Sequence, residues 1–195
     1  MDYRMIEMSG MKKREADDGK IYLEGYFARF DEPYWVFPGW VEMIRKGAFK
    51  NYLESGKDVK ILWNHNPDIV LGSTAAGTAS LTEDDEGLYG TVEINRSDTD
   101  AMNAYARVLR GDVSGCSFGF DIKEFDERID DDGIYHTELI EIEPLYEVSP
   151  CTFPAYETTN INARSRERMD NFRKRKLDRW KEEMRKKLKG EEDGA

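Results

Sequence analysis

Short β-favouring runs, each bounded by turn-forming residues, are the feature of this chain that most constrains its fold. The runs are rich in β-branched and aromatic residues, and clusters containing Gly, Pro or Asp separate them. They cover residues 21–30, 59–65, 78–81, 88–94, 115–129, 134–142 and 145–152. The Asp132-Gly133 pair between two of these runs is a strong signal for a β-hairpin. We therefore predict a mainly β fold of the α+β class, with few helices.

Two short helices are expected beside the strands. In residues 47–56 the apolar spacing fits one helical face, and Gly56 suits a left-handed stop. In residues 99–109 apolar side chains recur at i, i+3, i+4 and i+7, and Gly111 can end the helix. The apolar positions of this second helix are Met102, Tyr105, Ala106 and Leu109. We expect these four side chains to face the body of the protein.

The residue pattern divides the chain into three parts. Residues 1–18 mix charges and methionines without a clear period, so a flexible segment is expected there. Residues 19–162 contain the β-rich runs and are interpreted as a single domain. For residues 163–195 the spacing predicts a separate amphipathic helix. Its apolar stripe consists of Met169, Phe172, Leu177, Trp180, Met184 and Leu188.

The charges follow the same division. Residues 163–195 contain 13 Lys and Arg against 8 Asp and Glu, which leaves 16 against 32 for residues 1–162. A body with a net charge near −16 repels nucleic acid and anionic membranes, so a nucleic-acid role would depend on the basic tail alone. The apolar runs are far shorter than the roughly 20 residues that a membrane-spanning helix needs. We expect neither nucleic acid nor a membrane as a partner.

The cysteines and acidic clusters indicate no cofactor. Cys116 and Cys151 are the only cysteines, too few for a disulfide scaffold, and no apolar stretch follows Met1 as a signal peptide would require. A reducing cytoplasm is therefore the expected compartment. The chain has no dense cluster of His and Cys for a metal, and residues 130–132, three aspartates, are interpreted as a solvated turn. We expect no metal and no other cofactor.

Imidazole chemistry in this chain must use His65 or His136, because there are only two histidines. His65 lies at the end of an apolar run just before a polar loop, where a rigid strand could present a general base. His136 follows the acidic turn and is expected in a solvated hairpin. Because many isolated histidines are structural, position alone leaves the role of His65 open.

Ser117 and Glu147 could complete a hydrolase site. In residues 115–120, strand alternation puts the side chains of Cys116, Phe118 and Phe120 in the core. Ser117 would then point to the other side, where it could face a cleft or lie as a simple surface serine. Glu147 lies in a β-like stretch between two prolines and needs a partner if it is buried. That partner could be an imidazole or an arginine.

Together, an alcohol, an imidazole and a carboxylate supply what a serine hydrolase needs. The imidazole takes the proton of the alcohol, and the carboxylate holds the imidazole in the right tautomer. Ser117, His65 and Glu147 fit these three roles. Ser114 is a rival nucleophile, because it lies only three residues before Ser117 and the assignment depends on the register of the motif.

Several segments, in order along residues 20–165, resemble the prohead proteases of tailed bacteriophages. They are Gly25-Tyr26-Phe27, Ala48-Phe49, Asn64-His65-Asn66, Leu71-Gly72, Glu86-Gly87-Leu88, residues 111–120 (GDVSGCSFGF), Glu147-Val148-Ser149-Pro150 and Pro154-Ala155-Tyr156. By this resemblance His65 is the base, Ser117 the nucleophile and Glu147 the third member of the triad. The family is similar in fold to the herpesvirus assemblins, which use a second histidine in place of the acid, so His136 is a rival third member. The resemblance implies a herpesvirus-protease-like β-barrel wrapped by a few helices.

The resemblance also implies an assembly-linked serine endopeptidase. Such enzymes work inside the procapsid in the host cytoplasm, where they remove scaffold segments from the major capsid protein or cleave a separate scaffold protein. The portal and the protease itself are further expected partners. The helix of residues 163–195 would be a targeting or scaffold-contacting arm, removed by self-cleavage near the polar junction of residues 160–165. Two alternatives remain: a catalytically silent capsid-assembly or scaffolding module, and nucleic-acid binding through the basic tail.

Overall fold

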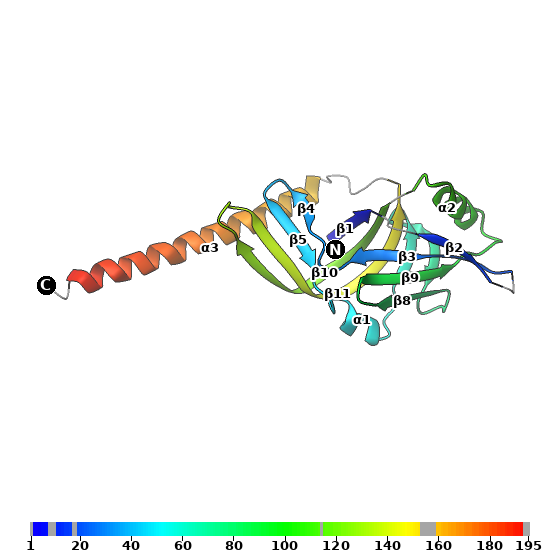
Figure 1. The fold of residues 1–195 in the computed structure, drawn as a ribbon, viewed down its shortest axis with the longest axis horizontal. Coiled ribbons are helices and arrows are strands. Elements are labelled where there is room, and N and C mark those ends of the chain that lie inside the picture. Colours follow the sequence, from blue (N-terminus) through cyan, green and yellow to red (C-terminus); the bar gives the residue numbers. More distant parts are fainter. Residues whose placement is uncertain (1, 8–10, 17–18, 114, 153–158, 193–195) are drawn as a thin grey trace.

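The computed structural model describes residues 2–7, 11–16, 19–113, 115–152 and 159–192, which form two β-sheets and three helices (Figure 1). The larger sheet contains β1 (Asp2–Glu7), β10 (Gly115–Ile129), β11 (Tyr135–Cys151), β5 (Trp40–Ile44) and β4 (Tyr34–Phe37) in that order, with β6 (Lys60–Trp63) paired to β11 and β7 (Asn66–Ser73) paired to β6. The smaller sheet has the order β2 (Lys12–Glu15), β3 (Ile21–Arg29), β9 (Gly87–Glu93) and β8 (Ala79–Glu83). The prediction of a mainly β protein with few helices is confirmed.

The two sheets are separate hydrogen-bonded units. Within the described residues no ladder joins β2 or β8, the outer strands of the smaller sheet, to the larger sheet. Closing a barrel requires a continuous ladder around all strands. The described strands therefore do not form the closed barrel that the family resemblance implied.

One apolar core joins the two sheets. Cys116, Phe118 and Phe120 of β10 are fully buried in it, as strand alternation predicted. The smaller sheet contributes side chains such as Phe27 of β3 and Leu88 of β9 to the same core. Because one face of each sheet is buried against the other, polar side chains on β10 and β11 are directed to the opposite face of the larger sheet.

Strand β11 is a long central strand of the larger sheet and pairs with different strands at its two ends. It pairs antiparallel with β10 along most of its length. Its first residues, from Tyr135 to Leu139, pair in parallel with β5, whereas Glu147 and Val148 pair in parallel with β6. Side chains near residue 136 and near residue 147 therefore belong to different neighbourhoods of one strand.

The predicted hairpins are confirmed. Strands β8 and β9 pair antiparallel across the acidic turn of residues 84–86, and β10 pairs with β11 across residues 130–134. In the second turn Asp130 Oδ1 accepts a hydrogen bond from Ile134 N at 2.9 Å, and Gly133 has a φ of +80°. The acidic run at residues 130–132 thus belongs to a tight turn, as expected.

Both predicted helices are present in the body, but the buried face of the second only partly overlaps the predicted one. Helix α1 (Lys50–Glu54) is short, and α2 (Thr99–Arg110) begins at an Asp98 cap and ends at Gly111, whose φ is +83°. The predicted apolar face of α2 included Leu109, which is 43% exposed. The buried residues are Ala101, Ala104 and Val108. Of the predicted positions, Met102 and Tyr105 are partly buried and pack against the core, so the buried face overlaps the predicted one but is centred nearer to Ala104.

Residues 2–7 and 12–15 form strands where the sequence predicted a flexible segment. Strand β1 pairs antiparallel with β10, and Met5 lies opposite Ser117 in the backbone register. The prediction was wrong because these residues have no clear local period, and their strand structure comes from ladders with distant strands: residues 2–7 pair with β10 and residues 12–15 with β3. The N-terminal strand thus borders the strand that carries the predicted nucleophile.

The C-terminal helix α3 (Thr159–Glu192) extends away from the body (Figure 1). A helix is present in the region predicted to be helical but starts earlier, so residues 160–165 of the expected junction lie in its first turns. Met169 is buried against Trp40 and Tyr135, and Phe172 packs beside them. Farther along, the stripe is exposed at three positions: Leu177, Trp180 and Met184.

Candidate active site

His65 lies on a two-residue turn between β6 and β7. Trp63 and Asn66 are paired across this hairpin, and Asn64 and His65 have φ angles of +52° and +59°. Two positive φ values at the central positions are typical of a type I′ turn, which suits tight hairpins. The prediction that the strand continues to His65 was therefore wrong by two residues. The turn projects the imidazole beyond the strand end.

This turn is fixed to the end of β11 by hydrogen bonds from its first residue. Asn64 N donates to Pro150 O at 3.1 Å. The Asn64 side chain donates to Thr152 Oγ1 at 3.1 Å and accepts from Thr152 N at 2.8 Å. Sequence reasoning assigned no role to Asn64, although asparagine is a common residue for a positive φ. Its three hydrogen bonds set the position of the neighbouring histidine relative to β11.

His65 and Glu147 are in direct contact. His65 Nδ1 lies 2.7 Å from Glu147 Oε1, and the Glu147 side chain is only 6% exposed against 27% for His65. An ionised carboxylate only accepts hydrogen bonds, so the Nδ1 of a neutral imidazole in this pair carries the proton. Nε2 then becomes the nitrogen with the basic lone pair. Of the two partners left open for Glu147, imidazole or arginine, the structure has the imidazole.

Ser117 lies on the same face of the larger sheet as Glu147. It is the backbone partner of Ser149, and Gly119 is the partner of Glu147, on adjacent antiparallel strands. Directly opposed residues point to the same face, with Cα atoms about 4.5–5.5 Å apart. Ser117 is therefore one strand away from the residues that contact His65. It is only 1% exposed, so in the described part of the chain Ser117 neither lines an open cleft nor lies on the surface, the two alternatives that the sequence left open.

Ser149 was missed as a site residue. Its hydroxyl donates a short hydrogen bond to Glu147 Oε2 and accepts one from His65 N at 3.2 Å. The side chain is fully buried. A period of two along β11 puts residues 147 and 149 on one face, so strand alternation could have indicated Ser149 once Glu147 was chosen.

The structure describes His136, the rival third member of the triad, but not Ser114, the rival nucleophile. His136 lies near the start of β11, where its Nε2 is 2.8 Å from Asp130 Oδ2. This hydrogen bond holds the pKa of Asp130 below its ordinary value. At roughly 3.3 Å per strand residue, the 11 steps from His136 to Glu147 correspond to about 36 Å along the strand, so His136 does not join the cluster around His65. Ser114 lies outside the described residues.

The two thiols near the cluster are buried and free. Burial raises the pKa of Cys116 well above its ordinary value. Burial, with a smaller contribution from the Glu147 charge, raises the pKa of Cys151 to about 12. A thiol is a strong nucleophile only as the thiolate. Neither cysteine is therefore activated at neutral pH, in keeping with the packing role expected for Cys116.

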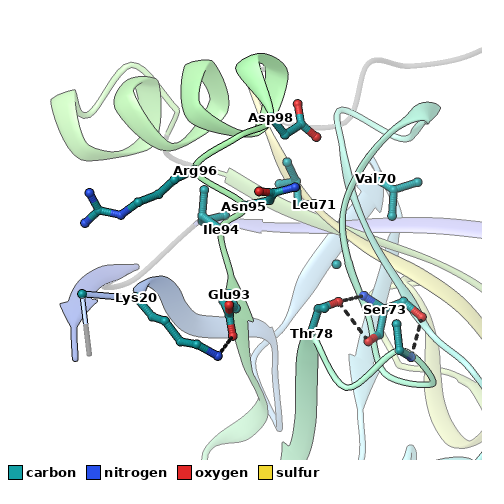
Figure 2. A pocket seen from close by; sticks show the side chains of 13 residues that line it. Lys20, Val70, Leu71, Ser73, Thr78, Glu93, Ile94, Asn95, Arg96 and Asp98 are labelled. Atoms are coloured by element: carbon teal, nitrogen blue, oxygen red, sulfur yellow. Dashed lines mark hydrogen bonds and ion pairs between the residues drawn. The ribbon is translucent and has the colours of Figure 1, made fainter. Parts of the chain in front are cut away.

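A separate pocket of about 530 Å³ lies between β7, β9 and the start of α2 (Figure 2). An ion pair between Lys20 and Glu93, with an Nζ to Oε2 distance of 2.9 Å, lies on its wall. Ser73 and Thr78 are joined by hydrogen bonds on another side. None of the predicted catalytic side chains lines this pocket. The candidate active site is therefore defined by the hydrogen bonds around His65 and not by this pocket.

Two absences concern only the part of the chain that the structure describes. There, no three His, Cys, Asp or Glu side chains gather in an arrangement that could hold a metal ion. No helix in that part combines the length and the apolar character needed to cross a bilayer.

A comparison with protein families identifies the family of this chain. The profile described as caudovirus prohead serine protease matches residues 9–175. The prohead protease of Enterobacteria phage HK97 is 33% identical over 124 residues, which are 63% of this chain and 52% of the relative, so the match spans about half of that protein. The solved capsid assembly protease of bacteriophage T4 is 13% identical with a TM-score of 0.48, over 79% of this chain and all of the other. On the family match, which covers most of its length, this chain belongs to the caudovirus prohead serine proteases.

Proposed function

We propose that this protein is a serine endopeptidase of phage head maturation, in which Ser117 is the nucleophile, His65 the general base and Glu147 the orienting carboxylate. The observation that carries the proposal is the 2.7 Å contact between His65 Nδ1 and Glu147 Oε1. That contact lies on the sheet face that also carries Ser117, one strand away. The family to which the chain belongs is one of serine proteases.

The proposed reaction follows from the roles of the three groups. Nε2 of His65 takes the proton of Ser117 Oγ as the hydroxyl attacks the carbonyl carbon of the scissile bond. Glu147 stabilises the imidazolium that forms, and the imidazolium then gives its proton to the leaving amine. Water, deprotonated by the same histidine, releases the acyl group. Because Ser117 is 1% exposed, a substrate carbonyl reaches it only after the segments that cover it are displaced.

The proposed substrates are the scaffold segment of the major capsid protein or a separate scaffold protein, with the portal and the protease itself as further partners. The reaction would take place inside the procapsid in the host cytoplasm. Similarity to the HK97 prohead protease supports this assignment. The exposed stripe of Leu177, Trp180 and Met184 on α3 supports a scaffold-contacting arm.

Self-cleavage near residues 160–165 would require the first turns of α3 to unwind. A fold related to the herpesvirus assemblins stays a prediction.

The test uses the full chain expressed together with the capsid protein precursor. Ser117→Ala is expected to lower the rate of precursor cleavage by about 10⁴-fold or more, as loss of a catalytic nucleophile does in other serine proteases. Ser114→Ala is the matched control and should leave cleavage intact. Mass spectrometry of the fragments gives the cleavage sites, and circular dichroism shows whether each variant folds.

Two results would reject this proposal. Unchanged processing by a folded Ser117→Ala variant would favour a catalytically silent scaffolding module. If Ser114→Ala loses precursor cleavage and Ser117→Ala retains it, the nucleophile is Ser114 and not Ser117. A nucleic-acid role through the tail would require a gel shift that disappears when residues 166–195 are deleted.

A further inference from the structure

Ser149 is hydrogen bonded to both other groups of the cluster, at a buried position that sequence reasoning did not single out. Its Oγ donates to Glu147 Oε2, while Oε1 of the same carboxylate contacts His65 Nδ1. The same Oγ accepts from the backbone N–H of His65 at 3.2 Å. The contacts form a closed ring: His65 N–H to Ser149, Ser149 O–H to Glu147, and Glu147 back to the His65 imidazole.

The first consequence of this ring concerns the carboxylate. Glu147 is 4% exposed, and a buried carboxylate oxygen without a donor is strongly unfavourable. The imidazole satisfies one oxygen only. Ser149 satisfies the other, and two donors on opposite oxygens prevent rotation of the carboxylate about its terminal bond. Oε1 is therefore held in place toward Nδ1.

The second consequence concerns the turn. His65 has a positive φ of +59°, a conformation that is uncommon for a residue with a side chain. The hydrogen bond from its N–H to Ser149 fixes this backbone to β11. Because Ser149 is also the cross-strand partner of Ser117, one side chain sets the position of the histidine relative to the nucleophile strand.

We infer that Ser149 is a positioning residue of the active site, which holds the His65–Glu147 pair in the orientation needed to activate Ser117. This inference rests on the proposed function. It also distinguishes the roles of the two neighbouring serines. The Ser149 hydroxyl donates its single proton in a hydrogen bond to Glu147 Oε2, so we assign Ser149 the positioning role and Ser117 the role of nucleophile.

The test measures the initial rate of cleavage of purified capsid protein precursor by purified full-length variants. Ser149→Ala is expected to lower kcat by about 10- to 100-fold with little change in KM, because small displacements of catalytic groups have effects of this size. Ser149→Thr keeps the hydroxyl and should restore most of kcat. Ser149→Cys fills nearly the same space with a much weaker donor, so it should resemble the alanine variant.

Ser73→Ala is the matched control. Ser73 is also buried and its Oγ also donates to a carboxylate, that of Asp58 at 2.8 Å, but it lies at the far end of β7 from His65. Its kcat should stay within about twofold of wild type, since no catalytic group is displaced. A second readout is the proton NMR signal of the His65 Nδ1–H, which is expected at low field in the wild type and Ser149→Thr and shifted in Ser149→Ala.

The outcomes distinguish the two proposals. If Ser117→Ala abolishes cleavage but Ser149→Ala and Ser149→Cys both keep wild-type kcat and an unchanged Nδ1–H signal, the positioning role of Ser149 is wrong and the triad stands. If Ser149→Ala does not fold, the kcat of Ser149→Cys tests the positioning role instead. A wild-type kcat in that variant would show that Ser149 contributes only packing and that its hydrogen bond to Glu147 has no role in catalysis. If Ser117→Ala still cleaves the precursor, the triad itself fails.

Discussion

Arg4 and Glu42 form an ion pair inside the larger sheet, and its energetics can be tested directly. Arg4 Nε contacts Glu42 Oε1 and Nη2 lies 3.0 Å from Oε2, with only 5% and 2% of the two side chains exposed. Thr137 Oγ1 donates to the same carboxylate at 3.2 Å and accepts from Trp40 Nε1 at 2.8 Å. The pair connects the N-terminal strand β1 to β5, and through Thr137 to β11.

We predict that Arg4→Met lowers the free energy of unfolding by about 3–5 kcal/mol, the usual effect of leaving one charge of a buried pair without its partner. The double variant Arg4→Met/Glu42→Met removes both charges. Its loss should be only about 1–2 kcal/mol, mainly from the Thr137 hydroxyl that then has no acceptor. The double variant is therefore expected to be more stable than Arg4→Met alone.

The assay is urea unfolding followed by tryptophan fluorescence and circular dichroism, with agreement between the two signals as the check for a two-state transition. Arg14→Met is the control, because the Arg14–Glu24 pair is on the surface, with side chains 45% and 21% exposed. It should change stability by less than about 1 kcal/mol. The reasoning is refuted if Arg4→Met behaves like Arg14→Met, or if the double variant is no more stable than Arg4→Met alone.

Two further predictions concern the smaller sheet and the turn after β7. Burial raises the pKa of Asp58, but hydrogen bonds from Lys60, Ser73 and a backbone N–H outweigh it and leave that pKa well below its ordinary value of 3.8. Because the pKa is lowered in the folded state, the ionised Asp58 carboxylate stabilises the fold at pH values above 3.8, and this contribution is lost as pH falls below 3.8. The difference in unfolding free energy between wild type and Asp58→Asn, measured by urea unfolding, should therefore become smaller below pH 3.8. A difference that stays constant from about pH 7 to about pH 2 would contradict this. Gly87→Ala should lower the unfolding free energy by about 1–3 kcal/mol or more, because the added Cβ would lie 2.0 Å from Ala28 O. Unchanged stability would show that strands β3 and β9 can move apart at no cost in free energy.

Regular local patterns predicted most of the individual elements. The Asp-Gly hairpin, the α2 helix with its Gly111 stop, and the burial of Cys116, Phe118 and Phe120 agree with the structure. Each depends on the preferences of a few consecutive residues. The face of α2 was predicted only in part, because two adjacent apolar stripes exist on that helix: Met102 and Tyr105 pack against the core, but the fully buried positions belong to the neighbouring stripe.

The candidate site could be predicted only in part. His65, Ser117 and Glu147 were chosen by residue type and motif, and the contact between His65 and Glu147 joins residues 82 positions apart. That contact depends on the parallel pairing of β6 with β11, which no local pattern specifies. The positive-φ turn at His65 was read as a continued strand, since the apolar alternation does not show where a hairpin reverses.

The sequence by itself determined which residues could supply an alcohol, an imidazole and a carboxylate, and that the runs rich in β-favouring residues would contain strands, because these follow from side-chain chemistry and short-range spacing. Only the tertiary structure decided that Glu147 rather than His136 meets His65, that Ser149 closes the hydrogen-bond ring, and that the N-terminal residues become a strand beside Ser117. The physical reason is that β11 is one long strand whose two ends pair with different neighbours. Which of its side chains meet the histidine therefore depends on the register of strands that are distant in the chain.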